Sequence, residues 1–97
     1  MTRWIAIITN NQEIGALREK HMKAHMGFLE SHPEITMAGS TTANGAIASN
    51  GGVWVIKGVS YAQAVKICED DPFFKVGMRQ NINVFEYRVA PWFEELV

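Results

Sequence analysis

The stretch "LREKHMKAHMGFLESHP", from Leu17 to Pro33, has the pattern of one amphipathic helix. At about 100° per residue, its apolar side chains gather on one face and its charged side chains on the opposite face. The pattern starts near Gln12 and continues to about Ser31. Pro33 ends it, because the residue before a proline is pushed out of the helical region. All three histidines of the chain lie in this stretch: His21, His25 and His32.

Short apolar runs on both sides of this helix predict strands. The run from Trp4 to Thr9 precedes it, and the runs from Ile35 to Ser40 and from Gly52 to Gly58 follow it. The last two runs are separated by small and polar residues that include the turn-prone pair Asn44-Gly45, so they predict a hairpin with a long tip. We expect this loop, from Thr41 to Gly51, to close over a pocket as a lid.

A second helix and a fourth strand complete the pattern. Ser60 followed by Gln63 is a capping box, which predicts a helix that begins there and runs to the acidic residues before Pro72. From Ile82 to Val89 the sequence alternates with the two-residue period of a half-buried strand. Pro91 ends that strand.

The order β-α-β-β-α-β predicts an α+β fold. By the handedness and short-connection rules, it forms a four-stranded antiparallel sheet with both helices on one face, which is the ferredoxin-like fold. At 97 residues the chain is long enough for a single domain, residues 1–97. Large aromatic residues remain for the second face of the sheet: Trp4, Trp54, Phe85 and Tyr87. Exposed apolar patches of that size mark interfaces, so we expect a homodimer joined sheet to sheet.

The composition excludes several classes of partner. Nine basic and ten acidic side chains give neither an excess of positive charge nor a basic run, so we expect no nucleic-acid partner. The apolar run near the N-terminus is too short for a signal peptide or a membrane span, so we expect no membrane partner. The single cysteine, Cys68, cannot form an intramolecular disulfide, which fits a reducing compartment. We therefore expect a cytoplasmic protein.

The histidines carry the chemistry of the first predicted helix. His21 lies near the middle of its apolar face, where a polar ring needs either a partner or a pocket. One interpretation is a core histidine bonded to a backbone carbonyl, and the other is a proton-transfer group. His25 adds the i, i+4 spacing of helical metal ligands, but the glutamate of the zinc-protease pattern is missing, so we expect no metal. His32 is expected to cap the C-terminus of the helix.

Acidic residues lie at an unfavourable place, the end of the second predicted helix, where the negative end of the dipole disfavours carboxylates. Glu69 and Asp70 are compatible with a solvated helix end. Asp71 precedes Pro72 and must leave the helix, and the two phenylalanines that follow draw this corner toward the core. A carboxylate held there needs a donor. With both helices on one sheet face, we expect His21 to pair with Asp71 as an acid/base pair at a cleft.

The chain resembles the YCII-related family of small dimeric α/β-barrel proteins over nearly its whole length. The resemblance rests on three motifs: "REKH" (Arg18 to His21), "AGS" (Ala38 to Ser40) and "DPF" (Asp71 to Phe73). It implies that His21 and Asp71 are the acid/base pair of the family. Where the family commonly has a proline after "AG", this chain has Ser40, which would reshape the pocket.

The resemblance also implies a function. The enzymatic branch of the family resembles a dehydrochlorinase that removes HCl from a chlorinated hydroxyquinol, and related dimeric barrels include muconolactone isomerases. We therefore expect an enzyme for cofactor-free elimination or isomerisation on a small cyclic or aromatic metabolite, with His21 and Asp71 moving its protons. Arg18, His25 and Ser40 are expected to bind the substrate, the first two by holding an anionic oxygen or a leaving chloride. The alternative is a non-catalytic dimer that binds a small molecule or a protein partner, with His21 and Asp71 as a structural pair.

Overall fold

The computed structural model describes residues 1–11 and 15–97, and it has the predicted order of strands and long helices. In sequence, the described elements are β1 (Arg3–Asn10), α1 (Gly15–Ser31), β2 (Ile35–Thr41), β3 (Gly51–Lys57), α2 (Tyr61–Asp70), α3 (Pro72–Lys75), β4 (Arg79–Glu86) and the short 3-10 helix η1 (Pro91–Phe93). The start predicted for the first helix, at Gln12, lies outside the described residues.

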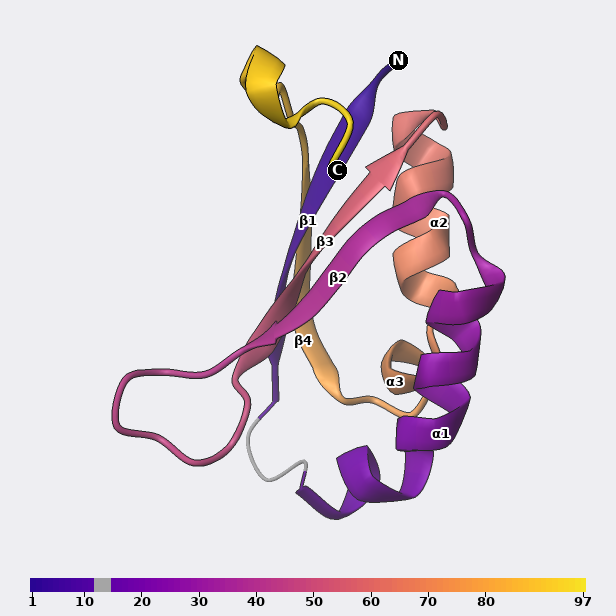
Figure 1. The fold of residues 1–97 in the computed structure, drawn as a ribbon. Helices are drawn as coiled ribbons and strands as arrows, with labels where there is room; N and C mark the ends of the chain where they lie inside the picture. Colours follow the sequence, from indigo (N-terminus) through magenta and orange to yellow (C-terminus); the bar gives the residue numbers. More distant parts are fainter. Residues whose placement is uncertain (12–14) are drawn as a thin grey trace.

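The four strands form one antiparallel sheet in the order β2-β3-β1-β4. β1 and β3 pair in the centre of the sheet, while β2 and β4 form its edges. Helices α1, α2 and α3 lie on the same side of the sheet (Figure 1). This arrangement is the predicted ferredoxin-like α+β fold.

The core lies between the sheet and the helices, and two of its residues correct a prediction. Trp4 and Trp54 do not lie on the uncovered face. Both pack in the core on the helix side, where Trp54 is only 2% exposed. Strand register explains this, because Trp4 pairs with Ile56 and Ala6 pairs with Trp54, which places all four on the same face.

The helix ends follow the local sequence. The capping box of α2 is present: the Ser60 hydroxyl accepts a hydrogen bond from the Gln63 backbone N–H, and the Gln63 side chain accepts one from the Ser60 N–H. At the end of α1, His32 Nδ1 lies 2.7 Å from the Phe28 carbonyl oxygen, which confirms the predicted cap. Asp71 leaves α2 with an extended backbone and starts α3, a short helix that the sequence pattern does not predict.

The second face of the sheet keeps exposed apolar side chains. Phe85 is 54% exposed, Tyr87 37% and Ile7 44%. The loop between β2 and β3 projects away from the helices (Figure 1), and Ile47 in this loop is fully exposed. The expected lid is therefore not closed over the helix side of the sheet. None of the described helices is long and apolar enough to cross a membrane.

Candidate functional site

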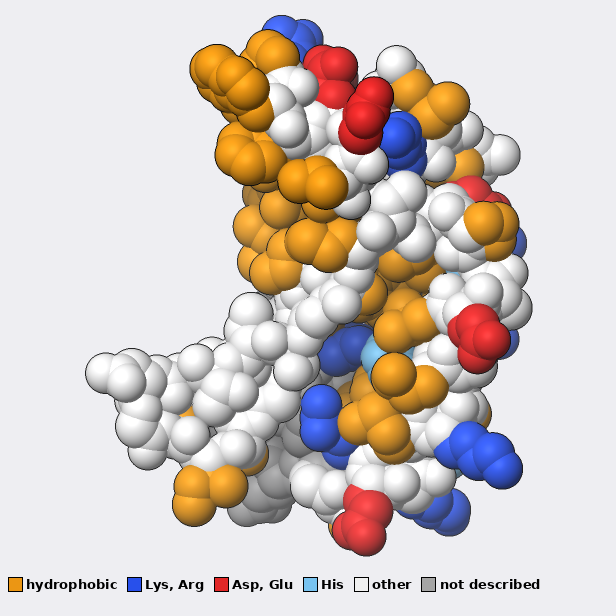
Figure 2. Space-filling view, in the orientation of Figure 1, with side chains coloured by type: hydrophobic (Ala, Val, Ile, Leu, Met, Phe, Trp, Pro, Cys, Tyr) orange, Lys and Arg blue, Asp and Glu red, His pale blue; other side chains and the backbone are white. Residues whose placement is uncertain are grey.

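A pocket of about 240 Å³ opens between α1 and the sheet. Its apolar wall contains Met22, Met26, Leu29, Trp54 and Phe73. Its strand wall is built of small residues of β2 and β3, with one from the loop between them: Ala38, Gly39, Ser40, Gly51 and Gly52, and Ser49 from the loop. Figure 2 shows a histidine side chain in this hollow, with Lys or Arg side chains beside it and hydrophobic side chains around it. The pocket therefore combines apolar and cationic surfaces.

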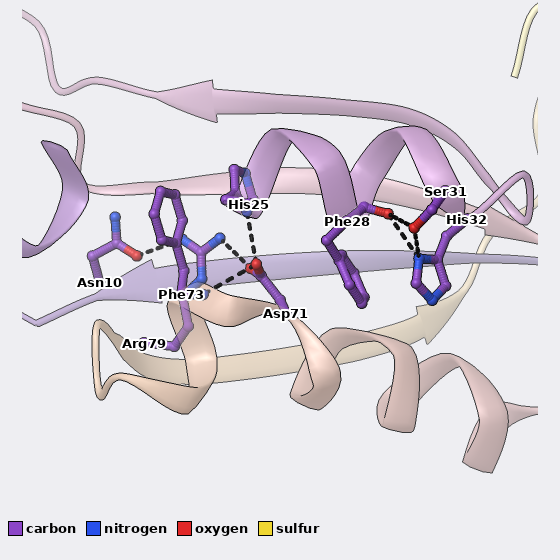
Figure 3. A network of polar contacts seen from close by, with 8 residues as sticks. All are labelled: Asn10, His25, Phe28, Ser31, His32, Asp71, Phe73 and Arg79. Atoms are coloured by element: carbon purple, nitrogen blue, oxygen red, sulfur yellow. Dashed lines mark hydrogen bonds and ion pairs between the residues drawn. The ribbon is translucent and has the colours of Figure 1, made fainter. Parts of the chain in front are cut away.

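At the base of the pocket, His25 on α1 contacts Asp71, which caps α3. His25 Nδ1 lies 2.7 Å from Asp71 Oδ1, and the two side chains are only 10% and 1% exposed (Figure 3). His25 lines the pocket, whereas Asp71 is fully buried behind it. A contact this short between two buried groups is a charge-assisted or strongly polar hydrogen bond.

Asp71 also binds two donors besides His25. Its Oδ2 lies 3.0 Å from Arg79 Nη2, and its Oδ1 accepts a hydrogen bond from the Phe73 backbone N–H at 3.1 Å. Arg79 in turn donates to Asn10 Oδ1 at 2.7 Å (Figure 3). The Arg79 side chain is 5% exposed, so the carboxylate and the guanidinium neutralise each other out of water. Both oxygens of Asp71 are thus occupied.

Aromatic packing fixes the orientation of these groups. The imidazole of His25 stacks on the Phe73 ring at a centroid distance of 4.0 Å and an interplanar angle of 12°. The Arg79 guanidinium carbon lies 5.2 Å from the centroid of the same ring. Since Nδ1 of His25 is held by Asp71, Nε2 is the ring nitrogen left for the pocket. The arrangement suits a histidine that exchanges a proton through Nε2.

The structure places His25, and not His21, against Asp71. The expected contact of His21 with Asp71 is therefore corrected to His25, one helical turn later. His21 is partly exposed and is not one of the residues that line the pocket in the described part of the chain. His25 shares its side of α1 with Phe28 and Leu29, which pack on the core. That i+3, i+4 spacing is the sequence signal that could have identified it.

Three of the five predicted site residues meet in the pocket: Arg18, His25 and Ser40. Sequence reasoning missed Asn10 and Arg79, which also line it. Asn10 carried a signal, because it follows the alternation of Ala6 and Ile8 toward the helix side of β1. Arg79, at the start of β4, carried none that a local pattern reveals.

The reactivity of Cys68 and the placement of metal-ligating side chains also bear on the chemistry of the site. Cys68 is buried under the site, and burial together with the negative charge of Asp71 raises the pKa of its thiol to about 12. The thiol is therefore protonated and a poor nucleophile at neutral pH. Within residues 1–11 and 15–97, no group of three or more His, Cys, Asp or Glu side chains is placed to hold a metal ion.

Comparisons with known proteins identify the family and agree with the fold. The sequence matches the family described as the YCII-related domain over residues 2–92. The fold resembles 5-chloro-2-hydroxyhydroquinone dehydrochlorinase from Burkholderia phenoliruptrix, solved in complex with 2,5-dihydroxybenzoquinone, with a TM-score of 0.81 and 19% identity over 91% of this chain and 95% of that chain. A protein from Arabidopsis thaliana is more distant, with a TM-score of 0.47 and 9% identity over 93% of this chain and 96% of that one. No curated protein sequence matches the chain. Because the family match spans nearly all of its residues, the chain belongs to the YCII-related domain family.

Proposed function

We propose that this protein is an acid/base enzyme that acts, without a cofactor, on a small cyclic or aromatic metabolite. The observation that carries the proposal is the buried contact of 2.7 Å between His25 and Asp71 at the base of a ring-sized pocket. The similarity in fold to a dehydrochlorinase supports elimination, such as dehydrochlorination of a chlorinated hydroxyquinol, and isomerisation is the related possibility. Neither reaction needs an oxidant or a reductant.

In this proposal His25 is the catalytic residue and Asp71 is a positioning residue. His25 Nε2 takes a proton from an O–H or C–H group of the substrate, while Nδ1–H remains bonded to Asp71. Asp71 holds the ring in one tautomer and stabilises the imidazolium that forms, and it does not reach the substrate because it is buried behind His25. General acid/base catalysis of this kind contributes about a hundred- to ten-thousandfold. The earlier expectation that Asp71 itself moves substrate protons is therefore revised.

The two candidate reactions differ in where the proton goes and in whether the bond between the ring and its chlorine substituent breaks. In elimination the substrate loses a proton and a chloride ion, so that a C–Cl bond breaks and HCl is the net product. In isomerisation the imidazolium returns the proton to another carbon and no group leaves. Ser40 lies on the strand wall of the same pocket, and we propose that its hydroxyl forms a hydrogen bond with an oxygen substituent of the substrate ring.

A substrate panel tests the proposal. Purified protein is mixed with hydroxyquinols, chlorinated hydroxyquinols and muconolactones, and ultraviolet absorbance is followed with His25→Gln and His21→Gln in parallel. We expect turnover that falls by about a hundredfold or more in His25→Gln and persists in His21→Gln. Loss of turnover in His21→Gln alone would contradict the assignment. Ligand binding with no turnover across the panel would support the non-catalytic alternative.

We further propose that the protein is a homodimer joined through the open sheet face. Ile7, Phe85 and Tyr87 expose apolar surface there, and Trp92 and Leu96 near the C-terminus are 83% and 71% exposed. A second copy of the chain would cover this surface. Light scattering at micromolar concentration should give twice the monomer mass, and Phe85→Glu should shift it toward the monomer. A wild-type monomer would refute the proposal.

We also expect the protein to act in the cytoplasm, because its single cysteine is a buried free thiol of the kind that reducing compartments preserve. Fractionation of cells that produce the untagged protein would check this expectation. Recovery outside the cytoplasm would refute it.

A further inference from the structure

We propose that the pocket selects ring compounds that carry an ionised oxygen, and that Arg18 is the residue that makes this selection. The inference rests on the proposed function only in taking this pocket as the ligand site.

The charge of the pocket lining supports the proposal. Two arginines and a histidine line the pocket, and none of its described lining residues is acidic: the charged or titratable ones are Arg18, His25 and Arg79. The buried carboxylate of Asp71 contacts two of these lining residues, His25 and Arg79, from behind. A cavity lined by charges of one sign raises the local concentration of ligands of the opposite sign.

The two arginines differ in how much of their charge is available. Arg79 is paired with Asp71 at 3.0 Å, and the two side chains are 5% and 1% exposed, so its charge is already neutralised. Arg18 has no carboxylate partner within ion-pair distance among the described residues, and it is partly exposed at the pocket wall. An anionic ligand would therefore meet Arg18 as the uncompensated positive charge.

Unpaired hydrogen-bond donors provide an independent argument. In the described part of the chain, two buried side-chain polar atoms have no partner, Asn10 Nδ2 and Arg79 Nε. Both are donors, and both belong to side chains that line the pocket. Folded proteins rarely leave such donors unpaired. This wall thus has more buried donors than its own acceptors satisfy, and their partial positive charges favour a negative charge in the pocket.

The apolar wall of the pocket accounts for the ring. Trp54 and Phe73 lie on it together with aliphatic side chains of α1, and the volume of about 240 Å³ suits one planar ring rather than a longer molecule. The ligand class that fits both walls is a single ring with an ionised phenolate, enolate or carboxylate oxygen directed at Arg18.

Three probes of the same shape and different charge test this inference: benzoate, benzamide and benzamidinium. Binding is followed by titration in heteronuclear NMR spectra, which also show whether each variant is folded. We expect benzoate to bind about tenfold or more tightly than benzamide, and benzamidinium to bind most weakly. Arg18→Gln should remove the preference for benzoate while leaving the affinity for benzamide unchanged, and Arg18→Glu should reverse the order.

Lys20→Gln is the matched control, since it removes one positive charge from an exposed position on the same helix. It should leave the order of the three probes unchanged. Equal affinities for the three probes, no binding of benzoate, or equal effects of Arg18→Gln and Lys20→Gln would overturn the inference. Because binding is measured without turnover, a protein that converts no substrate but prefers benzoate through Arg18 would refute the proposed function and not this inference.

Discussion

Replacement of Asp71 by Asn tests the buried contacts at the base of the pocket. The substitution keeps the shape of the side chain and removes the charge that Arg79 and His25 contact at 3.0 and 2.7 Å. The Arg79 guanidinium, 5% exposed, would then be a buried charge without a counterion. Breaking one side of a buried ion pair costs about 3–5 kcal/mol, against a typical total stability of about 5–15 kcal/mol. We expect a folded but much less stable protein.

Asp70→Asn is the control, because it makes the same change one residue earlier. Asp70 pairs with Lys66 at 3.2 Å, but those side chains are 40% and 74% exposed, so the expected loss is below about 1 kcal/mol. Urea unfolding followed by far-ultraviolet circular dichroism gives both free energies of unfolding. The double variant Asp71→Asn with Arg79→Met should lose less stability than the sum of the single variants, since no unpaired charge remains. The reasoning is refuted if Asp71→Asn costs no more than Asp70→Asn.

Three further predictions concern the surrounding structure. Cys68, with a pKa of about 12, should resist iodoacetamide at pH 8 in the folded protein and react in urea, and rapid labelling of the native protein would contradict this. Between about pH 9 and 12 the wild type should lose more stability than Cys68→Ala, because the thiol ionises in the unfolded protein before it ionises in the folded one. Gly52→Ala should lower the free energy of unfolding by about 1–3 kcal/mol, because the added Cβ would lie 2.7 Å from the Gly39 carbonyl oxygen. Gly27→Ala, whose added Cβ would have nothing within 4 Å, should instead raise the melting temperature, and equal effects of the two variants would refute the steric reasoning. Ser60→Ala should cost about 1 kcal/mol in urea unfolding through loss of the capping box, and an unchanged midpoint would contradict it.

Most of the fold could be predicted from local patterns. Hydrophobic periodicity distinguishes strands from helices, and the chain order with short connections leaves few alternatives to the ferredoxin-like sheet. The short helix α3 escaped because it has only four residues and depends on Asp71 as its cap. The side of the sheet that Trp4 and Trp54 face depends on strand register, which a one-residue shift reverses.

The candidate site could be predicted only in part. Asp71 was identifiable because a carboxylate before Pro72 at a helix end needs a partner. The choice between His21 and His25 depends on how α1 is rotated about its axis against the sheet, and both residues share the broad apolar side of the helix. Arg79 and Asn10 were missed because their contact joins residues 69 positions apart in the sequence, at the ends of two paired strands.

Deuterium exchange tests most directly whether His25 moves protons. The protein is incubated in D2O with the hydroxyquinol and muconolactone panel, and NMR follows the incorporation of deuterium at ring carbons above the rate in buffer. We predict protein-dependent incorporation that is lost in His25→Gln, strongly reduced in Asp71→Asn and retained in His21→Gln. Incorporation at the wild-type rate in His25→Gln, with the variant folded, would contradict the assignment of His25 as the proton-transfer residue.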